Sequence, residues 1–502
     1  MWEESMDSPG GGTFTRSQTM NSSVSTIVLP RTVAGLTNSS WEKKNGDSTT
    51  NTSPNDAPDM ASEEDTDVEM GPDVVATPKD NYIDPDSYPD GGIEAWTVVF
   101  GGFCALFVSF GWINCVGIFQ DYYQTHDLKS YSPSSVAWIP SLELFMMYLV
   151  VGYPFMQKEM SEIMAPLCGK GFDNFGPRYL LIGGSLFHVF GLMMTSLSTE
   201  YYQILLAQGI CSPFGAGFLF YPTMNSTVTW FYKKRALAVG IVASGSSLGG
   251  IIMPIMITKL IPMLGFPWTM RVCAFLILGL CIVACSCVKS RIPPHPRPLV
   301  LKEFFTPFLE MPFILLTTAT FLYCFGMFLP FTFLVLHARR FGVPDNLASY
   351  LVSIFNAASI LGRTLPGYAA DRMGLFNVVI IMSFFSVIVV FAIWLPSRGT
   401  IPDVIFAVLF GFASGSLVSL PPSLVAHISD VRKLGVRSGS MFATVSIAVL
   451  LGNPLGGSLV PDVIHGDYWR MQVFSGSMLL VGSMFFVFTR MRLAGTAIMK
   501  KI

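Results

Sequence analysis

The chain between Ala95 and Thr489 is a series of apolar stretches, each long enough to cross a lipid bilayer as a helix. A helix rises about 1.5 Å per residue, so a bilayer core needs about 20 apolar residues, and a helix satisfies its own backbone there. Twelve stretches meet this length. They predict transmembrane helices at Trp96–Phe119, Val136–Phe155, Tyr179–Leu197, Ile204–Val228, Ala236–Leu260, Trp268–Val288, Pro312–Leu336, Ala348–Ala370, Asn377–Leu395, Val404–Ile428, Ser438–Val460 and Met471–Thr489.

The composition argues against a soluble domain, because 51% of the residues are hydrophobic and 13% are charged. The formal net charge of -2 gives no indication of a nucleic-acid partner. Nine cysteines, mostly in the predicted helices, show no disulfide or metal-ligand spacing. We therefore expect an all-α polytopic membrane protein in a lipid bilayer, with no nucleic acid and no metal.

The chain divides into a polar tail and two groups of six predicted helices. Residues 1–89 are rich in Ser, Thr, Asn and acidic residues, which predicts a disordered cytoplasmic tail. An N-terminal half at 90–288, a cytoplasmic linker at 289–311, a C-terminal half at 312–489 and a cytoplasmic tail at 490–502 follow. Lys and Arg number seventeen on one side and seven on the other, which predicts cytoplasmic termini.

Two similar motifs, both fitting G-x-x-x-D-x-x-G, follow the second and the eighth predicted helix. Glycine permits close approach between helices, and an aspartate in such a loop can interact with a helix N-terminus or a basic residue. Two halves that rock around a central site are the natural inference, while the alternative is that these residues only loosen helix packing. The motif residues are Gly169, Asp173, Gly176 and Arg178 in the first copy, and Gly367, Asp371, Arg372 and Gly374 in the second.

Three short passages of the sequence resemble a known protein family, and they are more specific than the hydrophobic pattern. They are an acidic–glycine segment before the first helix, an aromatic–basic segment before the fifth, and a pair of glycines around an arginine in the eighth. Their residues are Asp90, Gly91 and Trp96; Lys234 and Arg235; and Gly362, Arg363, Pro366 and Gly367. The chain resembles the major facilitator superfamily and, within it, the fungal branch of the monocarboxylate transporter (porter) family. The resemblance implies two pseudo-symmetric six-helix halves, alternating access and substrate binding by the arginine of helix eight.

Arg363 is also a candidate binding residue on physical grounds. A charge near the bilayer centre costs at least about 2.5 kcal/mol, so such residues usually face a polar cavity. A guanidinium can bind a carboxylate through two hydrogen bonds, although Arg363 could instead be an internal tether to another helix. Asn356 and Ser359 precede Arg363 at helical spacing and can share its face. With Asn114, they are candidate substrate-binding residues.

Two positions depart from proton-coupled relatives. The resemblance places Asn114 where those relatives carry a lysine and Ser359 where they carry an acid. Neither side chain carries a proton at physiological pH. Glu143, inside the second predicted helix, is then the candidate proton carrier, with a satisfied packing residue as the alternative. His427 is expected at the membrane interface.

Residues 157–164 form a polar stretch between the second helix and the first motif. It is either a loop extension or a retained intron in the gene model.

The sequence predicts a secondary active transporter of small organic solutes, with monocarboxylate-type organic anions as the leading substrate and a proton as the candidate co-substrate. Efflux of a fungal secondary metabolite is one alternative, and a non-transporting nutrient receptor that signals through the N-terminal tail is another. The sequence contains no phosphate-binding loop, paired carboxylates or nucleophile motif, so we expect neither an enzyme nor a bound cofactor. The plasma membrane is the default location.

Overall fold

The computed structural model describes residues 88–136, 138–152, 176–291, 302–430, 433–460 and 467–495. All regular secondary structure within these ranges is helical. Residues 1–87 of the predicted tail lie outside the described residues, as do the motif residues Gly169 and Asp173 and the stretch 157–164.

The first group of helices, which we call the N-half, comprises residues 92–287. Its elements are α1 (Gly92–Val108), α2 (Phe110–Ile113), α3 (Val116–Thr125), α4 (Pro133–Val136), α5 (Trp138–Gly152), α8 (Pro177–Thr195), α9 (Tyr201–Ile204), the π-helix η2 (Leu205–Cys211), α10 (Ser212–Trp230) and α11 (Arg235–Cys287).

The second group, which we call the C-half, comprises residues 311–494 and follows two short elements, α12 (Lys302–Phe305) and the 3-10 helix η3 (Thr306–Leu309). Its elements are α13 (Met311–Arg340), α14 (Asp345–Met373), α15 (Leu375–Val389), the π-helix η4 (Val390–Trp394), α16 (Thr400–Ser419), α17 (Pro421–His427), α18 (Leu434–Ser458) and α19 (Trp469–Ala494).

Helices lie at all twelve predicted positions. Nine helical segments of the described chain are long and apolar enough to cross a membrane. One of them, α11, has 53 residues and covers two predicted spans. A kink at Gly265, with a φ of 76°, divides it into two helices just before Pro267. The other two predicted spans are occupied by α5 and α14.

Most helices start or end a few residues away from the predicted boundaries, and the first and tenth spans are also broken into shorter pieces. The first span begins at Gly92 rather than Trp96 and runs in three pieces to Thr125. The tenth begins at Thr400 rather than Val404 and breaks at Leu420, just before the Pro421–Pro422 pair. Proline lacks the N–H that would continue the helix, which explains the break.

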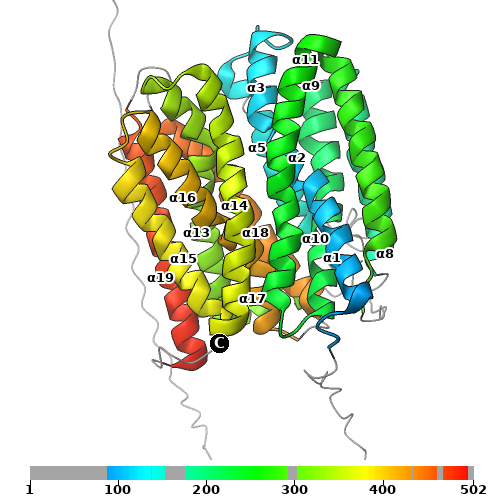
Figure 1. Cartoon of the computed structure of the whole chain (residues 1–502), viewed down its shortest axis with the longest axis vertical. Helices are drawn as coiled ribbons and strands as arrows, with labels where there is room; N and C mark the ends of the chain where they lie inside the picture. Colours follow the sequence, from blue (N-terminus) through cyan, green and yellow to red (C-terminus); the bar gives the residue numbers. More distant parts are fainter. Residues whose placement is uncertain are drawn as a thin grey trace, which may run out of the picture. The chain divides into compact units, whose positions relative to one another are not determined.

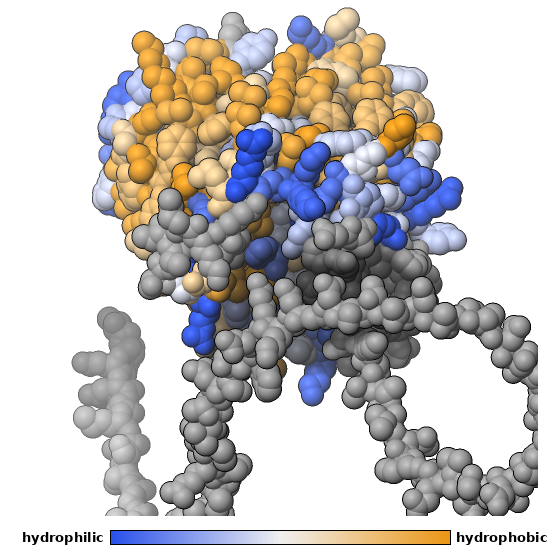
Figure 2. Space-filling model, turned by 60° about the horizontal axis from the view of Figure 1, so that its bottom comes forward, coloured by the Kyte–Doolittle hydropathy of each residue, from blue (hydrophilic) through white to orange (hydrophobic). Residues whose placement is uncertain are grey.

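The two halves contact each other mainly through α11 against α14 and α5 against α18 (Figure 1). The described chain begins and ends at the lower end of Figure 1, which we call the terminal end. Figure 2, which turns this end forward, shows hydrophobic residues over the side of the bundle and hydrophilic residues at the end. Large apolar side chains are exposed on individual helices, among them Leu186 and Phe190 on α8 and Ile388 on α15. Such a surface fits contact with lipid tails.

Candidate functional site

A cavity of about 60 Å³ lies between the halves, lined by α2, α5 and α11 on one side and by α13, α14 and α16 on the other. An engineered apolar cavity of about 150 Å³ holds a benzene molecule. The cavity is therefore smaller in this conformation than one aromatic ring requires, and any larger ligand needs the halves to separate.

The cavity wall is mostly apolar with a few polar groups. Among its described lining residues, Arg363 alone carries a formal charge at neutral pH, so the electrostatics favour an anion. The apolar lining consists of Phe110, Ile113, Leu144, Met327, Phe328, Phe331, Phe355, Gly415 and Val418, and the polar lining of Asn114, Tyr148, Ser246, Asn356, Ser359, Arg363 and Ser414.

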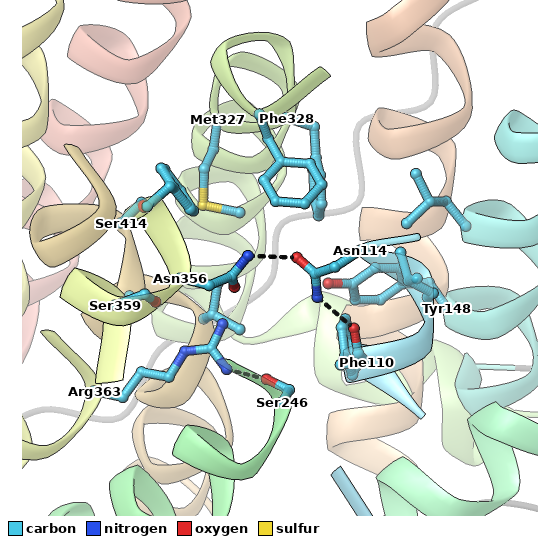
Figure 3. Close-up of a pocket in the computed structure, with 16 residues that line it drawn as sticks. Phe110, Asn114, Tyr148, Ser246, Met327, Phe328, Asn356, Ser359, Arg363 and Ser414 are labelled. Atoms are coloured by element: carbon cyan, nitrogen blue, oxygen red, sulfur yellow. Dashed lines mark hydrogen bonds between the residues drawn. The ribbon is translucent and has the colours of Figure 1, made fainter. Parts of the chain in front are cut away.

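Arg363 reaches from α14 in the C-half to α11 in the N-half (Figure 3). Its Nη1 donates to the carbonyl of Ala243 at 2.6 Å and to the hydroxyl of Ser246. Its buried Nε has no hydrogen-bond partner among the described residues. Arg363 is thus a tether between the halves that keeps one guanidinium edge, formed by Nε and Nη2, for a further acceptor.

A pair of amides joins the halves beside this arginine. Asn356 Nδ2 donates to Asn114 Oδ1 at 3.0 Å and to the carbonyl of Val352 at 2.9 Å. Asn114 Nδ2 in turn donates to the carbonyl of Phe110 at 2.8 Å. A Cβ at Gly250 would lie 2.7 Å from Asn114 Cγ and 2.8 Å from Asn356 Cγ, so only glycine leaves room for the amide pair.

Ser359 offers a second unused polar group at the cavity. It lies one helical turn before Arg363 on α14 and is 1% exposed. Its hydroxyl has no partner in the described part of the chain. The structure thus brings together all four residues for which the sequence predicts substrate binding, Asn114, Asn356, Ser359 and Arg363. Their role in binding remains a prediction.

Glu143 does not line the cavity, although α5 also supplies cavity residues. It is fully buried within the N-half, where its Oε2 accepts from Gln208 Nε2 at 3.3 Å. Tyr123 completes the cluster by donating to Gln208 Oε1 at 2.5 Å. Proton transfer between Glu143 and the cavity would need a path that these contacts do not provide. Its role as a proton carrier remains a prediction, while His427, at the end of α17, is exposed.

The second glycine–aspartate motif joins the halves at the terminal end. The carboxylate of Asp371 accepts from the backbone N–H groups of Ala236 and Leu237, both at 2.9 Å, in the first turn of α11. A Cβ at Gly367 would lie 2.6 Å from the carbonyl of Ala236. A carboxylate at a helix N-terminus is stabilised by the free N–H groups and the helix dipole. The contact joins α14 to α11 at the terminal end, and its role as a gate remains a prediction.

The remaining described motif residues lie at helix ends. Gly374, with a φ of 100°, forms the junction between α14 and α15, and Arg372 stacks over the ring of Tyr368 at 4.3 Å. In the first motif copy, Gly176 has a φ of 77° and precedes α8, whose first turn contains Arg178. Both glycines occupy the left-handed region, which other residues disfavour.

The segments before the first and fifth predicted helices contact each other, although the sequence treats them as separate passages. The carboxylate of Asp90 accepts from the backbone N–H groups of Tyr232 and Lys233 at 2.7 Å, and of Lys234 at 3.3 Å. Gly91 caps α1 directly after Asp90. Asp90 and Asp371 therefore both bind backbone N–H groups at the start of α11.

Aromatic and cationic side chains pack around the same contact. The guanidinium of Arg235 lies over the rings of Tyr88 at 5.8 Å and Tyr232 at 5.4 Å. Trp96 packs edge-on against Phe231, with ring centroids 5.4 Å apart. Two of the three passages that carry the family resemblance thus form one structural cluster at the terminal end.

The sequence analysis missed a buried ionisable pair in the C-half. His337 Nδ1 lies 3.3 Å from Asp403 Oδ1, and both side chains are fully buried. The predicted spans ended at Leu336 and began at Val404, one residue short of His337 and of Asp403. Boundaries extended by a single turn would have placed both ionisable residues inside membrane helices, where they become candidates for a functional site.

Comparison with known proteins identifies the family. A family model described as Major Facilitator Superfamily matches residues 98–403 and 316–497. The MFS-type transporter 1 of Ophiocordyceps sp. is 50% identical over 85% of this chain and 91% of its own length. The fujikurins efflux protein of Gibberella fujikuroi is 44% identical over 80% of this chain and 84% of its own length. The aspyridones efflux protein of Emericella nidulans is 35% identical over 82% of this chain and 80% of its own length.

A solved structure shares the fold. The Escherichia coli fucose:proton symporter superposes with a TM-score of 0.59 at 13% sequence identity, over 78% of this chain and 98% of its own. The twelve-helix, two-half transporter fold expected from the sequence is thereby confirmed. This multi-pass membrane protein belongs to the major facilitator superfamily, whose members move solutes across membranes.

Proposed function

We propose that this chain exports an organic anion of the secondary-metabolite type. The observation that carries the proposal is that two relatives aligned over at least 80% of this chain are named as efflux proteins of fungal metabolites. Their identities of 44% and 35% extend through both halves, so the architecture that handles the solute is shared.

The chemistry of the cavity supports an anionic substrate with an apolar body. The unused edge of Arg363 matches the two oxygens of a carboxylate or enolate-type acid, and a guanidinium binds such groups through paired hydrogen bonds. The rings of Phe110, Phe328 and Phe355 offer an apolar surface around this charge. Ser359 adds a neutral hydrogen-bonding group next to the guanidinium.

Transport requires a second conformation of the same helices. The cavity is too small for a metabolite as it stands, and Asp371 holds α14 against the start of α11 at the terminal end. In alternating access, the halves rock about the central site, so the contacts of Asp371 break when the terminal end opens. The amide pair of Asn114 and Asn356 would separate in the same motion.

A short monocarboxylate is the second candidate substrate. Arg363 and the segment beginning at Asp90 support it, since both belong to the resemblance to the monocarboxylate porter family. Asn114 and Ser359, which replace ionisable residues of the proton-coupled relatives, disfavour proton symport by the same groups. The large aromatic share of the cavity wall also favours a larger apolar anion.

We further propose that both termini are cytoplasmic and that the protein resides in the plasma membrane. The excess of Lys and Arg on the terminal side supports this orientation. The sequons at Asn21, Asn38 and Asn51 should then stay unglycosylated. Glycosylation of any of them in a secretory host would contradict the orientation.

The test is export from yeast cells that express the full chain and lack competing efflux pumps. Cells are loaded with naphthoate, pyrenebutyrate, lactate or acetate, and the loss of each acid is followed over time. We expect faster loss of the two aromatic acids and no change for the two short ones. The Arg363→Ala variant, present at equal level in the membrane, should export none of them. Faster loss of lactate alone would replace this proposal with the second candidate.

A further inference from the structure

A buried polar cluster lies away from the cavity, where the ends of α13, α16, α19 and η4 meet. His337 on α13 lies beside Asp403 on α16, at 3.3 Å between Nδ1 and Oδ1. Gln472 on α19 contacts His337 Nε2 at 3.2 Å through its own Nε2, which also donates to the carbonyl of Trp394 at 2.9 Å. The hydroxyl of Ser397 donates to Asp403 Oδ1 at 2.6 Å. These four side chains are at most 1% exposed.

The contacts of Gln472 fix the protonation of the histidine ring. The carbonyl of Trp394 only accepts, so the atom of Gln472 that faces it must be the amide nitrogen. The same nitrogen faces His337 Nε2, which must therefore carry a lone pair. A neutral imidazole then bears its proton on Nδ1, which lies 3.3 Å from Asp403 Oδ1 but makes no hydrogen bond within the described residues. With Asp403 ionised, this state holds one buried negative charge.

The groups around the cluster do not cancel this charge by direct contact. On α13, Arg340 lies over the ring of Phe341 at 5.8 Å, and Arg398 lies over the same ring at 4.7 Å. The imidazole packs against the same ring, with the centroids 4.8 Å apart. Both arginines are exposed.

The N-terminal end of α19 adds an aromatic neighbour and a further cation. Tyr468 packs edge-on against the imidazole at 5.5 Å, and Arg470 stacks over Trp469 at 5.5 Å. On the remaining sides, η4 contributes the indole of Trp394, and α16 contributes Asp403 itself. Among the described contacts of the cluster, the imidazole is thus the group positioned to take up a compensating positive charge.

We propose that His337 and Asp403 form a proton-binding site of the C-half, separate from the substrate cavity, in which proton uptake displaces Gln472. A proton from water binds the lone pair of His337 Nε2, giving an imidazolium beside the Asp403 carboxylate and no net charge in the cluster. The new N–H then faces the amide N–H of Gln472, and two donors cannot share a hydrogen bond. Gln472 must rotate or move away, which loosens α19 from α13 and from η4.

This proposal goes beyond the proposed export, since it requires no particular substrate. Protonation would change the packing of three C-half elements at the end of the bundle opposite to Asp371. A bistable contact of this kind can couple a proton to the rocking of the halves. The proton would be the co-substrate predicted from the sequence, bound at residues other than Glu143.

The experiment is nitrogen NMR of the full chain, labelled with ¹⁵N-histidine and held in lipid nanodiscs. The chemical shifts separate the two neutral tautomers from the imidazolium, and the His337→Gln variant identifies the signals of His337. We expect Nδ1–H and a bare Nε2 at neutral pH, and the imidazolium signal to appear when the sample is acidified. The Asp403→Asn variant should lose the imidazolium signal.

His188 in the N-half serves as the matched control. Its Nε2 lies 3.1 Å from the carbonyl of Val108 and its Nδ1 3.1 Å from the carbonyl of Ser212, and it lies in the other half of the molecule, so its signals should not change in Asp403→Asn. An Nε2–H tautomer for His337, or an unchanged titration in Asp403→Asn, would overturn the proposal. If Asp403→Asn fails to fold, Gln472→Glu provides an acceptor for Nε2–H and should make His337 an imidazolium at neutral pH. A neutral ring in that variant would also overturn it.

Discussion

The two halves bury the same kinds of polar residue in different arrangements. In the N-half, His188 contacts Ser212 and a backbone carbonyl, while Glu143 contacts Gln208. In the C-half, His337 and Asp403 lie side by side. The first arrangement gives each group a neutral partner, whereas the second places an imidazole where it can balance a carboxylate. A buried charge is costly unless it is paired, so the C-half has the arrangement suited to a change of charge.

The cavity shows the same difference. Its charged group, Arg363, comes from the C-half, and the acceptors that hold it, Ala243 and Ser246, come from the N-half. At the cavity, the C-half thus supplies the charged group and the N-half supplies a neutral frame that holds it. The predictions below test this division, starting with the contact between the halves.

The largest effect is expected where the frame meets the charged helix. A Cβ at Gly240 on α11 would lie 2.2 Å from the carbonyl oxygen of Arg363, and backbone cannot move aside as a flexible side chain does. Gly240→Ala should therefore abolish transport while the protein still reaches the membrane. Gly279→Ala on the same helix is the control, since nothing lies within 4 Å of its added Cβ. Equal transport by the two variants would show that the halves do not approach this closely.

The buried acids should differ in their contribution to stability. Asp403→Ala removes a buried carboxylate that accepts from Ser397 and lies beside His337. A hydrogen bond to a charged group contributes about 1.5–3 kcal/mol, so the variant should lower the free energy of unfolding by that amount. Glu143→Gln keeps the shape and a hydrogen bond to Gln208, and should cost less than about 1 kcal/mol. Denaturant unfolding of the purified proteins in detergent measures both. Similar losses would mean that Glu143 is as strongly paired as Asp403.

The contact at the terminal end should have a smaller effect. Asp371→Ala removes a carboxylate that caps α11, and losing such a cap costs about 0.5–2 kcal/mol. Because Asp371 joins the halves, we expect faster labelling of a cysteine placed at Ala238, as the terminal end opens more often. Asp90→Ala removes a capping carboxylate from the N-half alone and should leave this labelling rate unchanged. Faster labelling in both variants would show that Asp371 does not differ from Asp90 in holding the two halves together.

The smallest effect is expected at the amide pair. Hydrogen bonds between membrane helices average about 0.6 kcal/mol, so Asn114→Ala should weaken the contact with Asn356 by about that amount. Transport should change by less than roughly threefold, which corresponds to about 0.6 kcal/mol. Thr332→Ala, which removes the contact with Asn453 within the C-half, is the matched control. A complete loss of transport in Asn114→Ala would give Asn114 a direct role with the substrate.

Local sequence pattern predicted the helices and one face of the site. About 20 apolar residues suffice to indicate a membrane helix, and the spacing of Asn356, Ser359 and Arg363 places them on one helical face. The acceptors of Arg363 could not be predicted, because Ala243 and Ser246 lie more than 100 positions away in the chain. His337 and Asp403 were missed because helix ends are poorly defined by hydropathy, and both residues lie at such ends.

The most direct test of the account is a thermodynamic cycle between Arg363 and the charge of the substrate. Affinities of the purified protein and of Arg363→Ala are measured for an exported aromatic acid and for its uncharged amide. If the guanidinium binds the acid, the two changes should be coupled by about 1.5–3 kcal/mol, as expected for a hydrogen bond to a charged group. Additive losses, with no coupling between substrate charge and Arg363, would contradict an anion site at the centre of this transporter.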